Sequence, residues 1–78
     1  MNNIKTGKLY KCDRLVPFWD FDGDIYLGDI CSNSIFLIVD ILFATTNIPD
    51  FKIITSHGTV GWITVNKTNI KEITNGNR

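Results

Sequence analysis

The chain of 78 residues has room for one small domain, and a domain of this size buries only about 60% of the surface that its unfolded chain exposes. Hydrophobic residues make up 44% of the sequence and charged residues 21%, a composition that is typical of a globular protein and excludes a disordered one. A chain this short leaves no room for a large catalytic cleft with walls of its own.

The formal net charge is zero, but charges of opposite sign are segregated along the chain. All the aspartates lie between Asp13 and Asp50, whereas most of the lysines lie nearer the two ends. An acidic central region attracts cations and repels phosphates. The sequence therefore disfavours nucleic acid as a partner, and a nucleic-acid-binding barrel is kept only as a further alternative.

The residues that hold metals or react as nucleophiles are few. Cys12 and Cys31 lack the paired spacing of a zinc site, and nothing beside His57 supplies a nucleophile with an orienting carboxylate. The most apolar run, residues 35–43, contains Asp40 and is too short to span a bilayer. We expect no enzymatic activity, no metal or other cofactor, no membrane partner and a cytoplasmic location.

The first half of the chain predicts extended structure around a long loop. Residues 8–13 (KLYKCD) alternate in character with a period of two, which predicts a strand. The segment 14–24 contains Pro17 and Gly23 without a helical period, which predicts a long ordered loop. Residues 26–31 (YLGDIC) then return to extended structure.

Residues 35–43 (IFLIVDILF) are rich in β-branched and aromatic residues, which favours a strand over a buried helix. Strict alternation places Phe36, Ile38 and Leu42 on one face, around Asp40. Because both faces of this strand are apolar, one enters the core and the other needs a cover. The sequence thus leaves open a homo-oligomer or a larger assembly that buries Phe36, Ile38 and Leu42.

The last third of the chain predicts a hairpin followed by a short turn. Residues 51–56 and 60–64 flank a glycine-containing connection at 57–59, which is typical of a hairpin. The polar segment 65–69 predicts at most one short helical turn, and 70–73 predict a short last strand.

Five to six short strands and no helix of normal length predict an all-β fold, a small antiparallel barrel. The single domain is expected over residues 8–73. A flexible N-terminus, 1–7, precedes it, and a frayed tail, 74–78, follows it. Closure into a barrel removes the edges that a short sheet otherwise exposes.

The predicted hairpin, FKIITSHGTVGWI (51–63), resembles the signature of bacterial SH3-like domains. The matching residues are Phe51, Ile53, Gly58, Gly61, Trp62 and Ile63. KLYKC (8–12) is similar to the first strand of that family, and YLGDI (26–30) to its Gly-Asp turn before the second strand. The resemblance implies an SH3-like barrel that holds peptides, cell-wall fragments or a protein partner in a groove lined by aromatic side chains.

In that family the acidic residues of a long loop, called RT, pair with cationic residues of the ligand. The resemblance implies the following partner-binding residues: Tyr10, Phe18, Trp19, Asp20, Phe21, Asp22, Asp24 and Trp62. Asp50 and Thr64 stand where the family has a groove tryptophan and a proline, which predicts a diverged binding surface rather than a proline groove.

The loop FWDFDGD allows more than one interpretation. Asp20, Asp22 and Asp24 have the spacing of a calcium loop, but Ile25 and Cys31 stand where such a loop needs glycine and glutamate. We therefore predict no specific metal site, while weak association with calcium stays open. Aromatic side chains of small domains usually pack in the core, yet alternation keeps neighbouring rings from all being buried. Trp19 is the best candidate for an exposed anchor.

The leading hypothesis is a noncatalytic module that binds a protein or peptide, of cationic character, through the acidic-aromatic loop. A structural or homo-oligomeric assembly protein is the alternative. The abundance of isoleucine, asparagine and lysine indicates an AT-rich coding sequence. This composition suggests a phage or low-GC bacterial source, and for a phage protein a host partner in the host cytoplasm.

Overall fold

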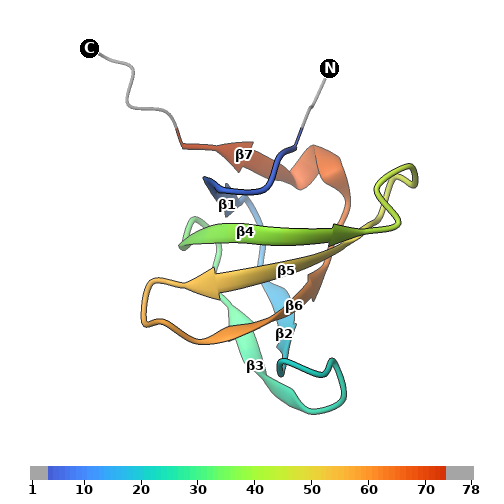
Figure 1. The fold of residues 1–78 in the computed structure, drawn as a ribbon. Helices are drawn as coiled ribbons and strands as arrows, with labels where there is room; N and C mark the ends of the chain where they lie inside the picture. Colours follow the sequence, from blue (N-terminus) through green and yellow to red (C-terminus); the bar gives the residue numbers. More distant parts are fainter. Residues whose placement is uncertain (1–3, 74–78) are drawn as a thin grey trace.

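The computed structural model describes residues 4–73 and shows an all-β protein with seven antiparallel strands in one open sheet (Figure 1). The strands are β1 (Lys8–Cys12), β2 (Val16–Trp19), β3 (Tyr26–Ile30), β4 (Ile35–Leu42), β5 (Asp50–Thr55), β6 (Val60–Thr64) and β7 (Ile70–Glu72). Their order across the sheet is β3-β2-β6-β5-β4-β1-β7. A 3-10 turn, η1 (Lys67–Asn69), precedes β7, and no helix in the described part of the chain is long and apolar enough to cross a membrane.

The predicted all-β class, the hairpin around residues 57–59 and the short helical turn are confirmed. The number of strands is seven instead of five to six, and the sheet is open, with β3 and β7 at its edges. The additional strand is β2, in the segment predicted to be a loop. Val16 and Phe18 of β2 are buried, and Pro17 between them is exposed as the register partner of Asp29 on β3.

A β-bulge in β4 changes which residues face the core. Val39 is skipped in the pairing with β5, so Asp40 takes the next register position. Phe36 and Ile38 are only 1% and 0% exposed, whereas Leu42, beyond the bulge, is 43% exposed. The prediction that these three residues share one exposed oligomer face is therefore wrong: two lie in the core, and the third faces the other way.

One cluster of buried side chains from six of the seven strands and the segment between β6 and η1 forms the core. Its members are Tyr10, Cys12, Val16, Phe18, Phe36, Ile38, Phe51, Ile53, Ile63, Val65 and Ile70. Figure 1 shows the sheet twisting strongly from β7 to β3, and this twist lets the inner faces of distant strands meet. The outer face, opposite the core, carries partly exposed side chains such as Lys52 and Ile54 of β5.

Gly61 permits the close approach of β2 to β6. A Cβ atom at this position would lie 2.1 Å from the carbonyl oxygen of Trp19 and 2.7 Å from the ring of Phe18. Real Cβ atoms do not approach other atoms this closely, so only glycine fits here. The absent side chain lets β2 bring Trp19 beside Trp62 on the outer face.

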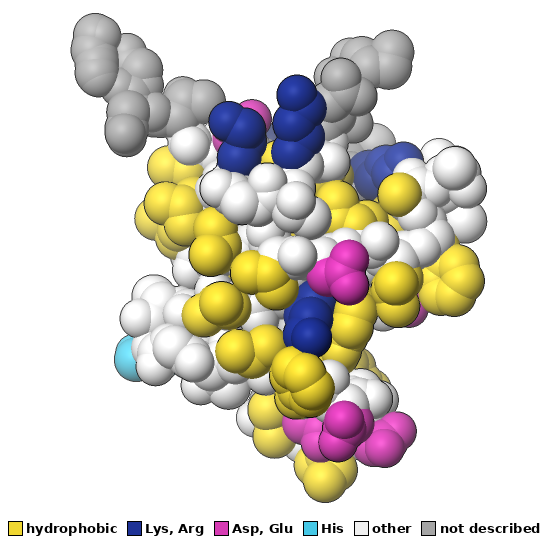
Figure 2. All heavy atoms as spheres, viewed as in Figure 1, with side chains coloured by type: hydrophobic (Ala, Val, Ile, Leu, Met, Phe, Trp, Pro, Cys, Tyr) yellow, Lys and Arg dark blue, Asp and Glu magenta, His cyan; other side chains and the backbone are white. Residues whose placement is uncertain are grey.

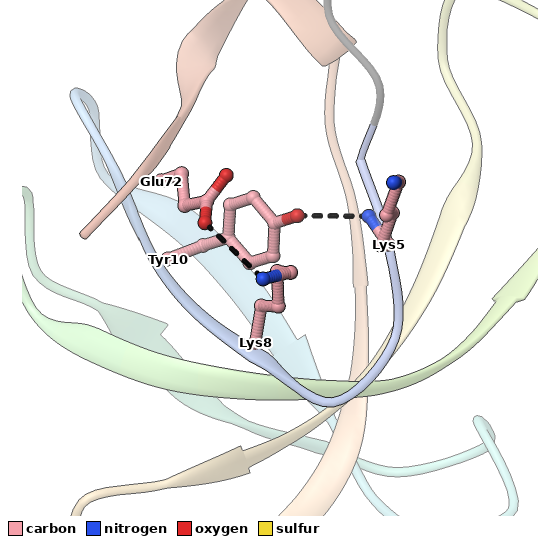
Figure 3. A network of polar contacts seen from close by, with 4 residues as sticks. All are labelled: Lys5, Lys8, Tyr10 and Glu72. Carbon is pink, nitrogen blue, oxygen red and sulfur yellow. Dashed lines mark hydrogen bonds and ion pairs between the residues drawn. The ribbon is translucent and has the colours of Figure 1, made fainter. Parts of the chain in front are cut away.

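Order begins before the predicted domain start at residue 8. Ile4 packs against the core, and the backbone N–H of Lys5 donates a hydrogen bond to Tyr10 Oη at 2.8 Å (Figure 3). Residues 4–7 therefore belong to the folded domain. Residues 1–3 and the predicted frayed tail, 74–78, lie outside the described residues.

Candidate functional site

A row of five side chains crosses the outer face of the sheet. Tyr26, Trp19, Trp62, Lys52 and Asp40 are successive register partners on β3, β2, β6, β5 and β4. Directly paired residues of neighbouring strands share one face of a sheet. The rings of Trp19 and Tyr26 meet edge to face, with centroids 5.7 Å apart. The row begins as an aromatic platform and ends in an oppositely charged pair of register partners.

Asp20 holds the loop between β2 and β3 in a compact turn. Its Oδ1 accepts hydrogen bonds from the backbone N–H groups of Asp24, at 2.8 Å, and Ile25, at 3.2 Å. The N–H of Gly23 donates to the Asp20 carbonyl oxygen at 2.9 Å. The N–H groups of Asp24 and then Ile25 lower the pKa of the Asp20 carboxyl, because they favour its charged form. Asp20 thus shapes the loop.

The tip of this loop folds back over the outer face. Trp62 Nε1 donates a hydrogen bond to the carbonyl oxygen of Phe21 at 2.9 Å. Lys52 Nζ lies 3.9 Å from the ring centroid of Phe21 and 5.8 Å from that of Trp62, within the range of cation–π attraction. An ammonium group of the protein itself therefore occupies the space beside two aromatic faces.

The loop and the middle of the row, Trp19, Trp62 and Lys52, border an open groove of about 670 Å³. Residues that line it include Trp19, Phe21, Asp22, Asp50, Lys52 and Trp62. Asp22 contributes a carboxylate from the loop and Asp50 one from β5, where Thr64 Oγ1 donates to Asp50 Oδ1 at 2.5 Å. Figure 2 shows hydrophobic side chains gathered over the middle strands above an acidic loop. The groove combines an aromatic floor with acidic margins.

The structure brings four of the predicted binding residues together at this groove: Trp19, Phe21, Asp22 and Trp62. The side chain of Trp19 is 36% exposed and that of Phe21 58% exposed, so both are accessible to a ligand. Asp24 is exposed on the same loop, but it does not line the groove.

Two predicted binding residues, Tyr10 and Phe18, are core side chains. They are 2% and 6% exposed, and Figure 3 shows the hydroxyl of Tyr10 turned to the backbone of Lys5. They point inward because alternation in β1 and β2 places them on the same face as Cys12 and Val16. The prediction that they contact a partner is wrong.

Lys52, Asp50 and Tyr26 belong to the candidate site but were not among the predicted binding residues, although the resemblance placed Asp50 at a groove position. The alternation along β5 could have indicated Asp50 and Lys52. Phe51 and Ile53 are buried, so the residues that alternate with them, Asp50 and Lys52, face outward. Tyr26 Oη donates to Asp29 Oδ1 at 2.6 Å, and this bond raises the pKa of the tyrosine. That hydrogen bond orients the outer end of the aromatic platform.

The groups considered for metal binding or reactivity lie apart. Within residues 4–73, no three His, Cys, Asp or Glu side chains are close enough together to hold a metal ion. Cys12 is buried, and desolvation raises the pKa of its thiol, whereas Cys31 is exposed; both are free. His57 is exposed in the turn between β5 and β6.

A search of protein-family models, of curated proteins and of solved structures finds no match to this chain.

Proposed function

We propose that this chain is a noncatalytic interaction module that binds a cationic peptide, or a cationic segment of a partner protein, in the groove beside the loop of residues 20–25. The observation that supports the proposal best is the position of Lys52 beside Phe21 and Trp62. Rings that accept the protein's own ammonium at 3.9 Å and 5.8 Å are arranged to accept that of a ligand.

The groove offers an extended peptide two kinds of contact. Trp19 lines the groove and Tyr26 lies beside it on β3, and both present exposed, rigid aromatic surface, the type of side chain that contributes most to binding free energy in interfaces. Asp22 and Asp50 flank this surface and attract lysine or arginine. A ligand cation would approach Asp22 and compete with Lys52 for the ring of Phe21.

The proposal also includes an SH3-like fold, a phage or low-GC bacterial source and a cytoplasmic location, as the sequence suggested. The β5–β6 hairpin, the first strand and the acidic loop between β1 and β3 support a diverged SH3-like barrel, in which the open sheet is strongly coiled. Asp50 and Thr64 replace the groove tryptophan and the proline of the SH3-like family, and this difference supports a diverged groove. Composition supports a phage or low-GC bacterial source and a partner in the cytoplasm.

Selection from a phage-displayed library of random peptides tests the proposed function. Peptides rich in lysine or arginine are expected, and their binding should be lost in the double variant Trp19→Ala, Asp22→Asn. Ile48→Ala, which truncates an exposed side chain outside the groove, is the matched control and should bind normally. Failure to enrich any cationic peptide, or undiminished binding by the double variant, would overturn the proposal.

A further inference from the structure

A second row on the outer face is apolar throughout. Leu9, Leu37, Ile54 and Val60 are successive register partners on β1, β4, β5 and β6. Leu9 is 46% exposed, and the other three are partly exposed. The row lies two residues along β5 and β6 from Lys52 and Trp62, so it adjoins the groove without lining it.

Two further residues of β4 widen this apolar row. Ile35 is 44% exposed, and the bulge residue Val39 is 36% exposed. Soluble monomers commonly expose single hydrophobic side chains, whereas a contiguous apolar patch marks an interaction surface. Figure 2 shows hydrophobic side chains adjoining one another across the middle of this view.

The margins of the apolar row carry opposite charges. Lys11 and Lys71 are register partners on β1 and β7, two residues from Leu9 along β1 and therefore on the same face. At the opposite side, the hydrogen bond from Trp62 to the Phe21 carbonyl holds the acidic loop with Asp22 against the outer face. Figure 2 shows mainly basic side chains at the top of the molecule and acidic side chains at the bottom, with charges of both signs between them.

We infer that the outer face binds a second copy of this chain, with the apolar row at the centre of the interface. A twofold axis through the row lays the basic margin of each copy over the acidic loop of the other. The same surface is therefore self-complementary and can be used by both copies. A stable interface needs about 800 Å² from each partner, roughly one sixth of the 4947 Å² surface of this chain. This inference does not rest on the proposed function, although both use the Asp22 carboxylate, so a second copy and a cationic peptide compete for it.

Sedimentation velocity of the full chain, from about 1 μM to about 500 μM, detects association through an interface of this size, because such interfaces have dissociation constants in the micromolar range or below. The mass should be that of a dimer at the upper end of the range. Leu9→Glu should keep the chain monomeric, whereas Leu15→Glu, which places the same charge on an exposed leucine between β1 and β2, should dimerise normally. A wild type that stays monomeric, or a Leu9→Glu variant that still dimerises, would overturn the inference.

A charge-swap series tests the arrangement of the two copies. It leaves Leu9 unchanged, so it also tests the inference if the Leu9→Glu variant folds poorly. Lys11→Glu with Lys71→Glu should weaken dimerisation by about tenfold or more, because like charges then face each other. Adding Asp22→Lys and Asp24→Lys should restore it. Swapped chains that do not recover would overturn the twofold arrangement, and peptide binding by a monomeric Leu9→Glu variant would separate this surface from the groove.

Discussion

At the scale of single residues, Lys52 determines the chemistry of the groove. Alternation places it on the outer face of β5, and the folded loop brings the ring of Phe21 to 3.9 Å from its ammonium group. The same cation lies 5.8 Å from the ring of Trp62. An internal cation of this kind occupies the position that we propose for a ligand cation, so it reduces the affinity that a ligand gains there.

Replacement of Lys52 tests this competition. Lys52→Gln should tighten the binding of a cationic peptide about two- to fivefold, because an exposed cation–π contact is worth about 0.5–1 kcal/mol and becomes available to the ligand. Isothermal titration calorimetry with a selected peptide measures the change. Lys5→Gln, which removes a charge outside the groove, is the control and should leave the affinity nearly unchanged. A weaker affinity for the Lys52 variant would show that Lys52 itself contacts the ligand.

At the scale of elements, the β2–β3 hairpin and its loop create the site. The strand β2 crosses close to β6 only because Gly61 has no side chain, and this approach places Trp19 beside Trp62. The loop is then closed by Asp20 and fastened to β6 by Trp62 Nε1. The sequence predicted a loop for residues 14–24, because Pro17 and Gly23 mask a four-residue strand whose burial alternates.

The Asp20 carboxylate should make the loop sensitive to acid. Its pKa is lowered in the folded protein, so the stabilisation that it provides is present above the unfolded pKa, near about 3.9, and is lost as pH falls through the lower folded value. The amide signals of Asp24 and Ile25 should titrate with a midpoint below about 3.9 in an NMR pH series. Asp20→Asn should abolish this step, while Asp13→Asn, outside the loop, should leave it intact. A midpoint at the ordinary aspartate value would contradict the prediction.

At the scale of the whole molecule, the sheet keeps one thiol in the core and one at the surface. Cys12, the last residue of β1, is fully buried, and burial raises the pKa of its thiol, whereas Cys31, which follows β3, is exposed. Alkylation requires the thiolate and access to solvent. The two thiols therefore report on different events: Cys31 on the folded surface and Cys12 on opening of the core.

Iodoacetamide at pH 8 should modify Cys31 rapidly and Cys12 only as fast as the domain opens. Mass spectrometry of Cys31→Ser follows Cys12 alone, and its rate should rise with urea as the unfolded fraction rises. Cys12→Ser is the complementary variant, and its rate should not depend on urea below the unfolding transition. Rapid labelling of Cys12 without urea would contradict the burial seen in the structure.

Local patterns in the sequence determined the all-β class, the β5–β6 hairpin, the turn before β7 and the exposure of Trp19. These features depend on period-two alternation and turn residues within a few positions, which the chain carries locally. Tertiary structure alone decided that Phe36 and Ile38 face the core and that the bulge at Val39 turns Leu42 outward.

Tertiary structure also decided that Lys52 lies beside Phe21 and Trp62, three residues far apart in the chain. Such contacts depend on the register between strands and on the path of the loop. A shift of one residue in that register would turn every side chain of a strand to the other face. Register is a property of the assembled sheet, and therefore the site, unlike the strands, became visible only in the folded protein.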